Sequence, residues 1–423
     1  MKSLIPFFIL SLYHKAFALV SAIRYGFPSK KLIVIGITGT NGKSTTVDLV
    51  HRIFVQAGFR VASASSLRFI IDGNEKKNEL KMTMPGRFFM QKFLRDAVTA
   101  KCDVAILEVT SEGIRQSRHA YIDFDVAAIT NITPEHIESH GSFEKYRAAK
   151  LKLFEAVAHS PKHGKAIIIN GDDPSAKLFL QTQRSEAWMY ALTQDKWDTL
   201  GHAVIPQSFT LHDEGIRFIT HGLEFSLKLF GKFNLYNALC AVSIALSRGI
   251  ATEDIRDALV GIAGVPGRLE FITSPTSSIF QVVVDYAHTP DALSNVYTTL
   301  TKKDRRLCCV LGSAGGGRDK WKRSEMGKIA DEYCAEIFLT NEDPYDENPE
   351  EIIRDIAKGI SKQKPNIILD RREAITAAIK KARSNDTVVI TGKGAEPLMM
   401  LEDGKRIPWD DREVVRDILN KVS

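Results

Sequence analysis

The chain has 423 residues, of which 44% are hydrophobic and 26% are charged, and its formal net charge is +6. This composition is globular and excludes a disordered chain or a polytopic membrane protein. The mild charge fits polyanionic small molecules at least as well as nucleic acid, and no concentrated basic stripe indicates nucleic acid binding. Because domains usually hold about 100–200 residues, two or three domains are expected.

The first segment, residues 4–23, is unusually apolar and precedes a basic stretch at 24–31. A secretory signal with a cleavage site at 16–18 is one interpretation. A membrane-spanning helix is another, although Pro6 near its start and Lys15 in its middle oppose it. We favour a helix that packs on the next domain or lies in a membrane interface with its cations at the headgroups, and of these two we slightly prefer packing.

The stretch at 32–48 predicts a buried strand, a glycine loop and a helix. Gly39 and Gly42 let the backbone approach an anion at the start of the helix, and Lys43 adds a positive charge. Ser44 can supply a hydroxyl to Mg²⁺. The strict phosphate-loop spacing requires a glycine at the position of Ile37, so a glycine turn before an ordinary helix is the alternative.

Two further strands are predicted to end in polar groups. The predicted strand at 103–109 has an apolar run at 104–107 that leads to Glu108, and residues 126–130 precede a segment that contains His136 and His140. The carboxyl ends of strands line the ligand crevice of open α/β sheets, so we assign Glu108 to a metal or to water rather than to a chance edge position. The histidines suggest a metal or phosphate environment, with helix capping as the alternative.

The next predicted helix carries a lysine on its apolar side. Tyr146, Lys150 and Phe154 are spaced four residues apart and therefore share one face. Burial lowers the pKa of a lysine and leaves the amine neutral more often, which carbamylation by CO₂ requires. A carbamate would be an anion beside Mg²⁺. The alternative is a side chain that extends past its neighbours to solvent.

A β-rich segment is predicted at 186–229, after a strand at 166–170. The helix that begins within 231–238 contains Asn234 and Asn237. Their amides could meet the edge of a nucleobase, and helix capping is the competing explanation.

A linker or hinge is predicted at 261–268, where three glycines and a proline fall in a short span. Beyond it, strands alternate with helices and predict a second doubly wound domain. The predicted strands are 281–284, 307–311, 335–339, 366–369 and 387–390. Polar clusters after four of them imply a second substrate surface, and these clusters are 285–288, 315–320, 342–345 and 392–396.

The five cysteines are Cys102, Cys240, Cys308, Cys309 and Cys334. Their number is odd, they lack zinc spacing and most of them lie in apolar runs, so we expect reduced core residues. This pattern points to a cytosolic compartment.

An ordered series of motifs resembles the Mur ligases, ATP-dependent enzymes that join an amino acid to a carboxylate. The series starts after Lys31 and comprises TGTNGKST, LEVTS, TNITPEH, YRAAK, GKFNLYN, VPGR, DYAHTP, RDKWKR and GKGAE. The resemblance is strongest to the members that add the third residue of the peptidoglycan stem peptide. It implies an α/β protein with a P-loop-type central ATPase domain, built on a mostly parallel sheet, and a C-terminal Rossmann-like domain. The implied bounds are 1–30 for an apolar helical segment, 31–264 for the central domain and 265–423 for the C-terminal domain.

The resemblance also implies ATP and Mg²⁺ as cofactors and a role for each matching residue. The catalytic residues would be Lys43, Glu108, His136 and Lys150, the last of them carbamylated, and the magnesium ligands Ser44, Glu108 and His136. The residues matched to ATP binding and to closure of the two domains are Gly39, Thr40, Asn41, Gly42, Lys43, Ser44, Thr45, Asn234, Asn237, Arg268, Asp285 and His288. Those matched to the muramyl peptide are Thr83, Thr110, Gln116 and Arg118, and those matched to the incoming amino acid are Arg318, Glu342, Asp343, Tyr345, Gly392 and Glu396.

The implied substrates are an amino acid and a muramyl peptide, with a UDP or a lipid carrier left open. We expect no nucleic acid partner, a monomer, and a cytoplasmic location with peripheral membrane contact through 4–23. Members that add the third residue begin with a uridine-binding domain, whereas only the apolar segment precedes Lys31 here. Members specific for diaminopimelate carry DNPR, and Tyr345 stands in place of that arginine, so the added amino acid is left open.

Two rival functions remain. A folylpolyglutamate synthase-like ligase shares the two-domain core, but the DYAH and RDK motifs favour the Mur ligases. A non-catalytic ATP-dependent binding protein of cell-wall assembly is the other rival, and the complete set of candidate catalytic residues opposes it.

Overall fold

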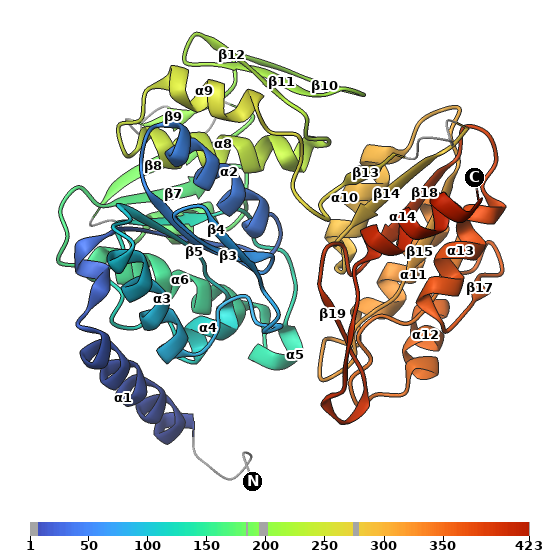
Figure 1. The fold of residues 1–423 in the computed structure, drawn as a ribbon, viewed down its shortest axis with the longest axis horizontal. Helices are drawn as coiled ribbons and strands as arrows, with labels where there is room; N and C mark the ends of the chain where they lie inside the picture. Colours follow the sequence, from blue (N-terminus) through green and yellow to red (C-terminus); the bar gives the residue numbers. More distant parts are fainter. Residues whose placement is uncertain (1–6, 183–184, 194–201, 274–278, 423) are drawn as a thin grey trace. The chain divides into compact units, whose positions relative to one another are not determined.

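The computed structural model describes residues 7–182, 185–193, 202–273 and 279–422. The chain forms two compact units, each with its own sheets (Figure 1). The first unit comprises residues 1–134, 142–228 and 233–263, and the second comprises 135–141, 229–232 and 264–423. The domain bounds implied by the sequence resemblance stay a prediction.

The main sheet of the first unit has nine strands within the described part of the chain, in the order β4-β3-β2-β5-β1-β6-β7-β8-β9. All neighbours are parallel except at the β2-β3-β4 edge, where a hairpin adds two antiparallel strands. The bounds are β1 Ile33–Thr38, β2 Val61–Ala64, β3 Arg68–Ile71, β4 Asn74–Lys77, β5 Val104–Glu108, β6 Val126–Ile129, β7 Ala166–Asn170, β8 Glu186–Tyr190 and β9 Ala203–Val204. A separate antiparallel sheet consists of β10 Ser208–His212, β11 Gly215–Thr220 and β12 Leu223–Leu227.

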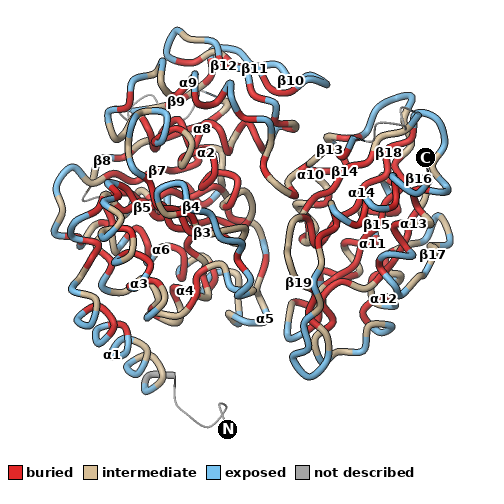
Figure 2. The backbone as a smooth tube through the Cα atoms, viewed as in Figure 1, coloured by how far each residue is buried: buried red, intermediate tan, exposed pale blue. Residues whose placement is uncertain are grey.

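Helices cover both faces of the main sheet, with α2 on one face and α3 and α6 on the other (Figure 1). Their bounds are α1 Phe7–Tyr25, η2 Pro28–Lys31, α2 Lys43–Gln56, α3 Arg87–Thr99, α4 Ser111–Arg115, α6 Phe143–His159, α7 Ala176–Leu180, α8 Lys232–Leu246 and α9 Thr252–Val260. The β-branched run of β1 suits a buried strand, and Figure 2 shows the sheet strands as the buried centre of the unit. Within β1, Gly36 leaves room for the side chains of Phe124 and Leu153, which a Cβ would meet at 2.9 and 3.0 Å.

The helix α1 packs against α3 in the first unit. It ends at Tyr25, followed by the left-handed Gly26 and Phe27. Within the described residues, the structure contains no helix with both the length and the hydropathy needed to cross a bilayer.

The second unit has a six-stranded sheet in its described part, in the order β13-β14-β18-β15-β16-β17, with only β13 antiparallel to its neighbour. The strands are β13 Glu270–Ile272, β14 Gln281–Asp285, β15 Leu307–Leu311, β16 Cys334–Leu339, β17 Asn366–Ile367 and β18 Thr387–Thr391, and β19 Leu398–Met400 pairs with β20 Arg406–Pro408. The helices are α5 Ile137–His140, α10 Pro290–Leu300, α11 Lys322–Tyr333, α12 Pro349–Ala357, α13 Arg371–Lys381, η3 Glu402–Gly404 and α14 Asp411–Val422. The apolar sides of α13 and α14 pack on one face of the sheet.

This architecture confirms the predicted fold class and the predicted strands of both units. Residues 194–201 of the predicted β-rich segment and residues 4–6 of the apolar segment lie outside the described residues. The prediction that all five cysteines are reduced is wrong, because Cys309 and Cys334 form a disulfide, while the other three are free and buried. The parallel pairing of β15 with β16 brings the two together, and spacing along the chain does not reveal this pairing. Cysteine usage therefore does not decide the compartment.

Candidate nucleotide and acceptor sites

The glycine loop joins β1 to α2 at the centre of the main sheet. Gly39 and Gly42 have φ angles of +146° and +83°, in the region that favours glycine. A Cβ on Gly39 would fall closer than 3.0 Å to Thr130 Oγ1, and one on Gly42 would fall closer than 3.0 Å to Asn237 Oδ1. Since α2 begins at Lys43, the amides of its first turn border this loop and make it a cradle for an anion.

The loop is held by side chains that follow β6. Asn131 accepts hydrogen bonds from the Thr40 amide at its carbonyl (2.9 Å) and from the Asn41 amide at its side-chain oxygen (2.9 Å). Thr130 Oγ1 donates to the Asn41 carbonyl at 2.6 Å. The Thr40 hydroxyl lies 3.0 Å from the Tyr146 hydroxyl of α6. The segment after β6 and the helix α6 therefore fix the loop.

Ser44 and Glu108 meet at the carboxyl ends of β1 and β5, where Ile37 and Glu108 are paired. Ser44 Oγ donates to Glu108 Oε2 at 2.8 Å, and the Ser66 amide donates to the same oxygen at 2.9 Å. Ser66 Oγ adds a third donor at 3.1 Å. Both Ser44 and Glu108 are buried. Hydroxyl and carboxylate oxygens are the ligands that Mg²⁺ prefers, so this pair suits an ion that is also bound to phosphate oxygens and water.

Lys150 lies on α6 and is buried together with Tyr146 and Phe154, as the spacing predicts. Its Nζ donates to the Gly39 carbonyl at 2.7 Å and lies 4.6 Å from the centre of the Tyr146 ring. The alternative in which this side chain extends to solvent is therefore wrong. The contact with Gly39 places the amine at the start of the cradle.

Asn234 and Asn237 are buried on α8, where the Asn237 amide donates to Asn234 Oδ1 at 3.0 Å. Because Asn237 borders Gly42, this pair forms one wall of the loop. Lys43 Nζ donates to the Thr40 carbonyl at 2.7 Å, so its charge lies over the same loop.

Three residues matched to the muramyl peptide come together around α4. Thr110 caps this helix by accepting from the Gly113 amide at 3.0 Å. Arg118 donates to Gln116 Oε1 at 2.8 Å and to the Met84 carbonyl, next to Thr83. Burial lowers the pKa of Arg118. Arg87, which the sequence did not single out, donates to the Gln116 carbonyl at 3.0 Å.

In the second unit, Asp285 ends β14 and bonds both the residue before β13 and the turn that follows β14. Its carboxylate accepts from the Leu269 and Ala287 amides, each at 2.6 Å, and burial raises its pKa. The Arg268 guanidinium lies 4.2 Å from the centre of the Tyr286 ring.

His288 follows the same strand. Its Nδ1 lies 2.9 Å from the Tyr286 carbonyl, and its Nε2 lies 3.6 Å from Glu135 Oε1. Burial raises the pKa of the Glu135 carboxyl, but His288 and Lys322 outweigh this effect and hold that pKa well below its usual range.

Lys393 is buried and bonds to residues that follow β16 and β18. Lys393 Nζ donates to Asp343 at 2.8 Å, to Glu396 at 2.6 Å and to the Leu398 carbonyl at 2.8 Å. Burial lowers the pKa of Lys393, but Glu396 and Asp343 outweigh it and raise the pKa above its ordinary value. Burial and then the charge of Asp343 raise the pKa of Glu342.

Three further residues of the predicted amino acid surface lie in the same unit. A Cβ on Gly392 would lie 2.6 Å from Glu342 Oε2, so this glycine permits the close approach of that carboxylate. Tyr345 is left-handed, with φ +52°, and its ring covers Gly316. Burial lowers the pKa of Arg318, yet charges near it, first Tyr286 and Tyr345, raise it overall.

The predicted magnesium set is divided between the units. Ser44 and Glu108 belong to the first unit, whereas His136 belongs to the second, where it precedes α5 with φ +56°. Among the described residues there is no group of three or more His, Cys, Asp or Glu side chains that could hold a metal by themselves. A metal ion bound at Ser44 would therefore need further ligands from the nucleotide.

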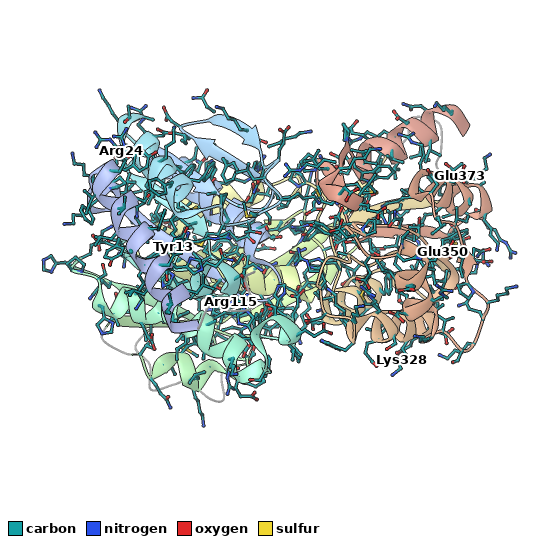
Figure 3. All side chains as sticks on the ribbon, turned by 90° about the horizontal axis from the view of Figure 1, so that it is seen from below. Tyr13, Arg24, Arg115, Lys328, Glu350 and Glu373 are labelled. Carbon is teal, nitrogen blue, oxygen red and sulfur yellow. A yellow bond between two sulfur atoms is a disulfide. The ribbon has the colours of Figure 1, made fainter. Side chains whose placement is uncertain are left out.

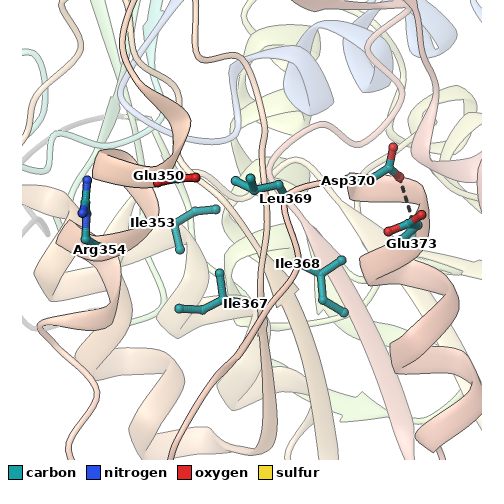
Figure 4. Close-up of a pocket in the computed structure, with 8 residues that line it drawn as sticks. All are labelled: Glu350, Ile353, Arg354, Ile367, Ile368, Leu369, Asp370 and Glu373. Atoms are coloured by element: carbon teal, nitrogen blue, oxygen red, sulfur yellow. Dashed lines mark hydrogen bonds between the residues drawn. The ribbon is translucent and has the colours of Figure 1, made fainter.

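A pocket of about 660 Å³ lies elsewhere in the second unit, between α12, β17 and α13 (Figure 4). It is lined by Glu350, Ile353, Arg354, Ile367, Ile368, Leu369, Asp370 and Glu373. The pocket contains none of the predicted site residues.

Sequence reasoning missed Ser66, Asn131 and Arg87 as contributors to these sites, and it included Lys393 in the predicted cluster at 392–396 without giving it a role. Ser66 and Asn131 follow β2 and β6, so their positions just past the carboxyl ends of predicted strands were an available signal. Lys393 stands between two glycines at the end of β18, which is a similar signal. The role of Arg87 depends on tertiary contacts alone.

A phosphate-binding loop at the carboxyl edge of a parallel sheet, together with a second Rossmann-like unit, defines a two-unit nucleotide-binding α/β protein. Residues 37–245 match the model of the Mur ligase middle domain, and residues 267–394 match that of the Mur ligase glutamate ligase domain. The chain belongs to the Mur ligase family.

The chain is similar to several known proteins along most of its length. The UDP-N-acetylmuramoyl-L-alanyl-D-glutamate–2,6-diaminopimelate ligase of Syntrophomonas wolfei is 39% identical over 413 residues, which are 96% of this chain and 81% of that protein. The corresponding ligase of Gloeobacter violaceus is 38% identical, over 96% of this chain and 80% of that protein. A solved structure of such a ligase is 30% identical with a TM-score of 0.61, covering 92% of this chain and 79% of the other. The folylpolyglutamate synthase of Mycobacterium tuberculosis has a TM-score of 0.70 at 18% identity over 96% of this chain and 94% of the other, a likeness of fold alone.

Proposed function

We propose that this chain is an ATP-dependent ligase that joins an amino acid to a carboxylate of a muramyl peptide. It would act in peptidoglycan precursor synthesis and so contribute to cell-wall biogenesis, cell shape and cell division. The observation that carries the proposal is the position of the Ser44–Glu108 pair and of Lys150 at the glycine cradle of a Mur ligase chain. Relatives with 33–39% identity are named for a UDP-linked muramyl dipeptide and diaminopimelate. We propose the same acceptor peptide and leave the amino acid open.

In this proposal the first unit binds ATP. The loop residues 39–45 hold the phosphates, with Lys43 over them, and the Asn234–Asn237 pair supports the loop from α8. Arg268, Asp285 and His288 serve the nucleotide from the second unit. The oxygens of Ser44 and Glu108 fit Mg²⁺, and the bound ion would offset phosphate charge. His136 is a further ligand only by the family resemblance.

The reaction proceeds in two steps. An acceptor carboxylate oxygen attacks the γ-phosphorus of ATP, the bond to ADP breaks, and an acyl phosphate forms. The amine nitrogen then attacks the acyl carbon, phosphate leaves, and the nitrogen loses a proton. Lys43 would stabilise the charge that develops on the transferred phosphoryl group, and a carbamate on Lys150 would supply an anion to a bound Mg²⁺.

The two remaining substrates are divided by unit. The first unit holds the muramyl peptide through Thr83, Thr110, Gln116 and Arg118. The second unit holds the amino acid through Arg318, Glu342, Asp343, Tyr345, Gly392 and Glu396. We further propose that the chain acts as a monomer in the cytoplasm and touches the membrane peripherally through the segment 4–23.

A phosphate-release screen tests this function. The full chain is given ATP, Mg²⁺, each of several amino acids, and either the UDP-linked muramyl dipeptide or a folate. We expect amino-acid-dependent phosphate release with the muramyl acceptor and none with the folate, and we expect Lys43→Ala to abolish it because the phosphoryl charge loses its main cation. Turnover with the folate alone, ATP binding without turnover for any acceptor, or amide formation by the variant would each refute the proposal.

A further inference from the structure

The inner side of α1 is built from small side chains. Ala18, Ser21 and Ala22 are buried against the rest of the unit, and the Ser21 hydroxyl donates to the Arg87 carbonyl of α3 at 3.2 Å. Small residues let α1 lie close to α3, and most of the large apolar side chains that the structure describes on this helix stay exposed.

The outer side of α1 carries those large apolar side chains in solvent. They are Ile9, Leu12, Tyr13, Phe17, Leu19, Val20 and Ile23, all exposed. Leu12 and Ile23 are each 60% exposed and Val20 is 55% exposed. Their spacing of three and four residues places most of them on one face. Tyr13 and Arg24, which are labelled in Figure 3, let the reader find this helix there. A continuous apolar face of this kind on a soluble unit marks an interaction surface.

The charged residues of α1 and of the segment just after it have one sign. Lys15, Arg24, Lys30 and Lys31 are exposed beside or just after it. The sequence contains no Asp or Glu before Asp48. An exposed apolar helix face with cations at its flanks is complementary to an anionic lipid surface, where the apolar side chains enter the acyl boundary and the cations meet headgroups.

The same helix is connected to the acceptor-side residues, by which we mean the residues of the first unit that are assigned to the muramyl peptide. His14, on the inner side of α1, accepts at Nδ1 from the Arg87 guanidinium, and Arg87 donates to the Gln116 carbonyl at 3.0 Å. Gln116 in turn accepts from Arg118. Burial, and then the charges of Arg87 and Arg118, lower the pKa of His14, so this junction is rich in positive charge.

We propose that α1 is a membrane-surface helix that holds the acceptor-side residues of the first unit against an anionic bilayer, so that the acceptor is a muramyl peptide on a lipid carrier. This inference rests on the proposed ligase function for its substrate, and on α1 alone for its membrane contact. A second copy of the chain fits the face less well, because its cations would be brought against one another. A protein partner would need acidic groups around an apolar groove, and an absence of binding to anionic vesicles would favour such a partner over a membrane.

Vesicle sedimentation of the full chain tests the membrane contact independently of activity. The probes are vesicles of phosphatidylcholine alone and vesicles that also contain phosphatidylglycerol. We expect binding to the anionic vesicles and at least a tenfold lower partition for Val20→Glu, which puts a carboxylate into the apolar face. Val260→Glu is the matched control, because Val260 is an exposed valine (52%) on the surface helix α9, and it should bind like the parent.

Three results would overturn the inference. The first is no binding to anionic vesicles, and the second is equal loss in the two glutamate variants. The third is a dimer in light scattering that Val20→Glu dissociates, which would make α1 a contact between copies. Circular dichroism melting of both variants checks that the fold is intact.

A second experiment tests the substrate. It compares the initial rate of ligation with the same muramyl peptide on a lipid carrier in anionic vesicles and on a soluble UDP carrier. We expect a higher initial rate with the lipid-linked acceptor, and we expect Val20→Glu to lower that rate while leaving the soluble reaction unchanged. A preference for the UDP-linked acceptor would refute the lipid-linked substrate. Vesicle binding without ligation of any muramyl acceptor would instead refute the proposed function and leave the membrane contact in place.

Discussion

The substitution Gly42→Ala separates backbone strain from steric conflict in the nucleotide cradle. At φ +83° an alanine costs about 1–2 kcal/mol relative to glycine. Its Cβ would also overlap Asn237 Oδ1, and this side chain is buried and bonded to Asn234, so it has little room to move. Overpacking of this kind costs about 1–3 kcal/mol, which gives a total of about 2–5 kcal/mol.

Gly58→Ala is the matched control for this prediction. Gly58 has nearly the same backbone angle, φ +86°, but a Cβ there would meet nothing within 4 Å. It should therefore lose only the strain, about 1–2 kcal/mol, and bind ATP normally. Gly42→Ala should lose more stability and also bind ATP at least tenfold more weakly, because the loop must shift away from Asn237.

Urea unfolding followed by tryptophan fluorescence measures the stability of both variants, and titration calorimetry with ATP measures their affinity. If Gly42→Ala and Gly58→Ala lost the same stability and bound ATP equally well, the loop would not be the rigid cradle described. A loss of affinity in Gly58→Ala would show that the strain, rather than the overlap with Asn237, disturbs the site.

Three other changes probe the chemistry and the second unit. Lys150→Arg keeps a donor near the Gly39 carbonyl but cannot be carbamylated, so the rate of ligation in a phosphate-release assay should fall at least about 100-fold. Near-normal turnover would contradict the role assigned to Lys150. The Arg323 guanidinium lowers the pKa of Glu347, so this ion pair stabilises the fold above the ordinary pKa of 4.5 and loses its effect as pH falls through the lowered pKa. Thermal unfolding of Glu347→Gln should therefore depend less on pH in this acidic range. An unchanged pH profile would refute the coupling. Asp411→Ala leaves the buried Arg371 guanidinium without its bidentate partner, so the free energy of unfolding measured in urea should fall by about 3–5 kcal/mol. A loss below about 1 kcal/mol would mean that water reaches this arginine.

The sequence predicted the strand, loop and helix at 32–48 because each part has a local signal: a β-branched run, two glycines and an amphipathic repeat. The burial of Lys150 was predictable for the same reason, since its neighbours at four-residue spacing are apolar. The strands of the second unit were predictable from their apolar runs and the polar residues that follow them.

Other features depend on contacts between distant segments and left no local pattern. Ser66 reaches Glu108 only because β2 pairs with β5. The disulfide between Cys309 and Cys334 requires the pairing of β15 with β16. The orientation of α1 was equally hidden, because hydrophobicity predicts that large apolar residues face inward, whereas this helix packs through its small ones.

The wall that Asn237 forms beside Gly42 has a consequence for synthesis of the chain on the ribosome. The glycine loop emerges early, but the residue that completes it lies on α8, after every strand of the main sheet has been made. A nascent chain truncated before α8 should therefore fail to hold nucleotide firmly, and ATP can favour the native state only late in translation. Cellular ATP would thus act on the released or nearly complete first unit and not on its early intermediates.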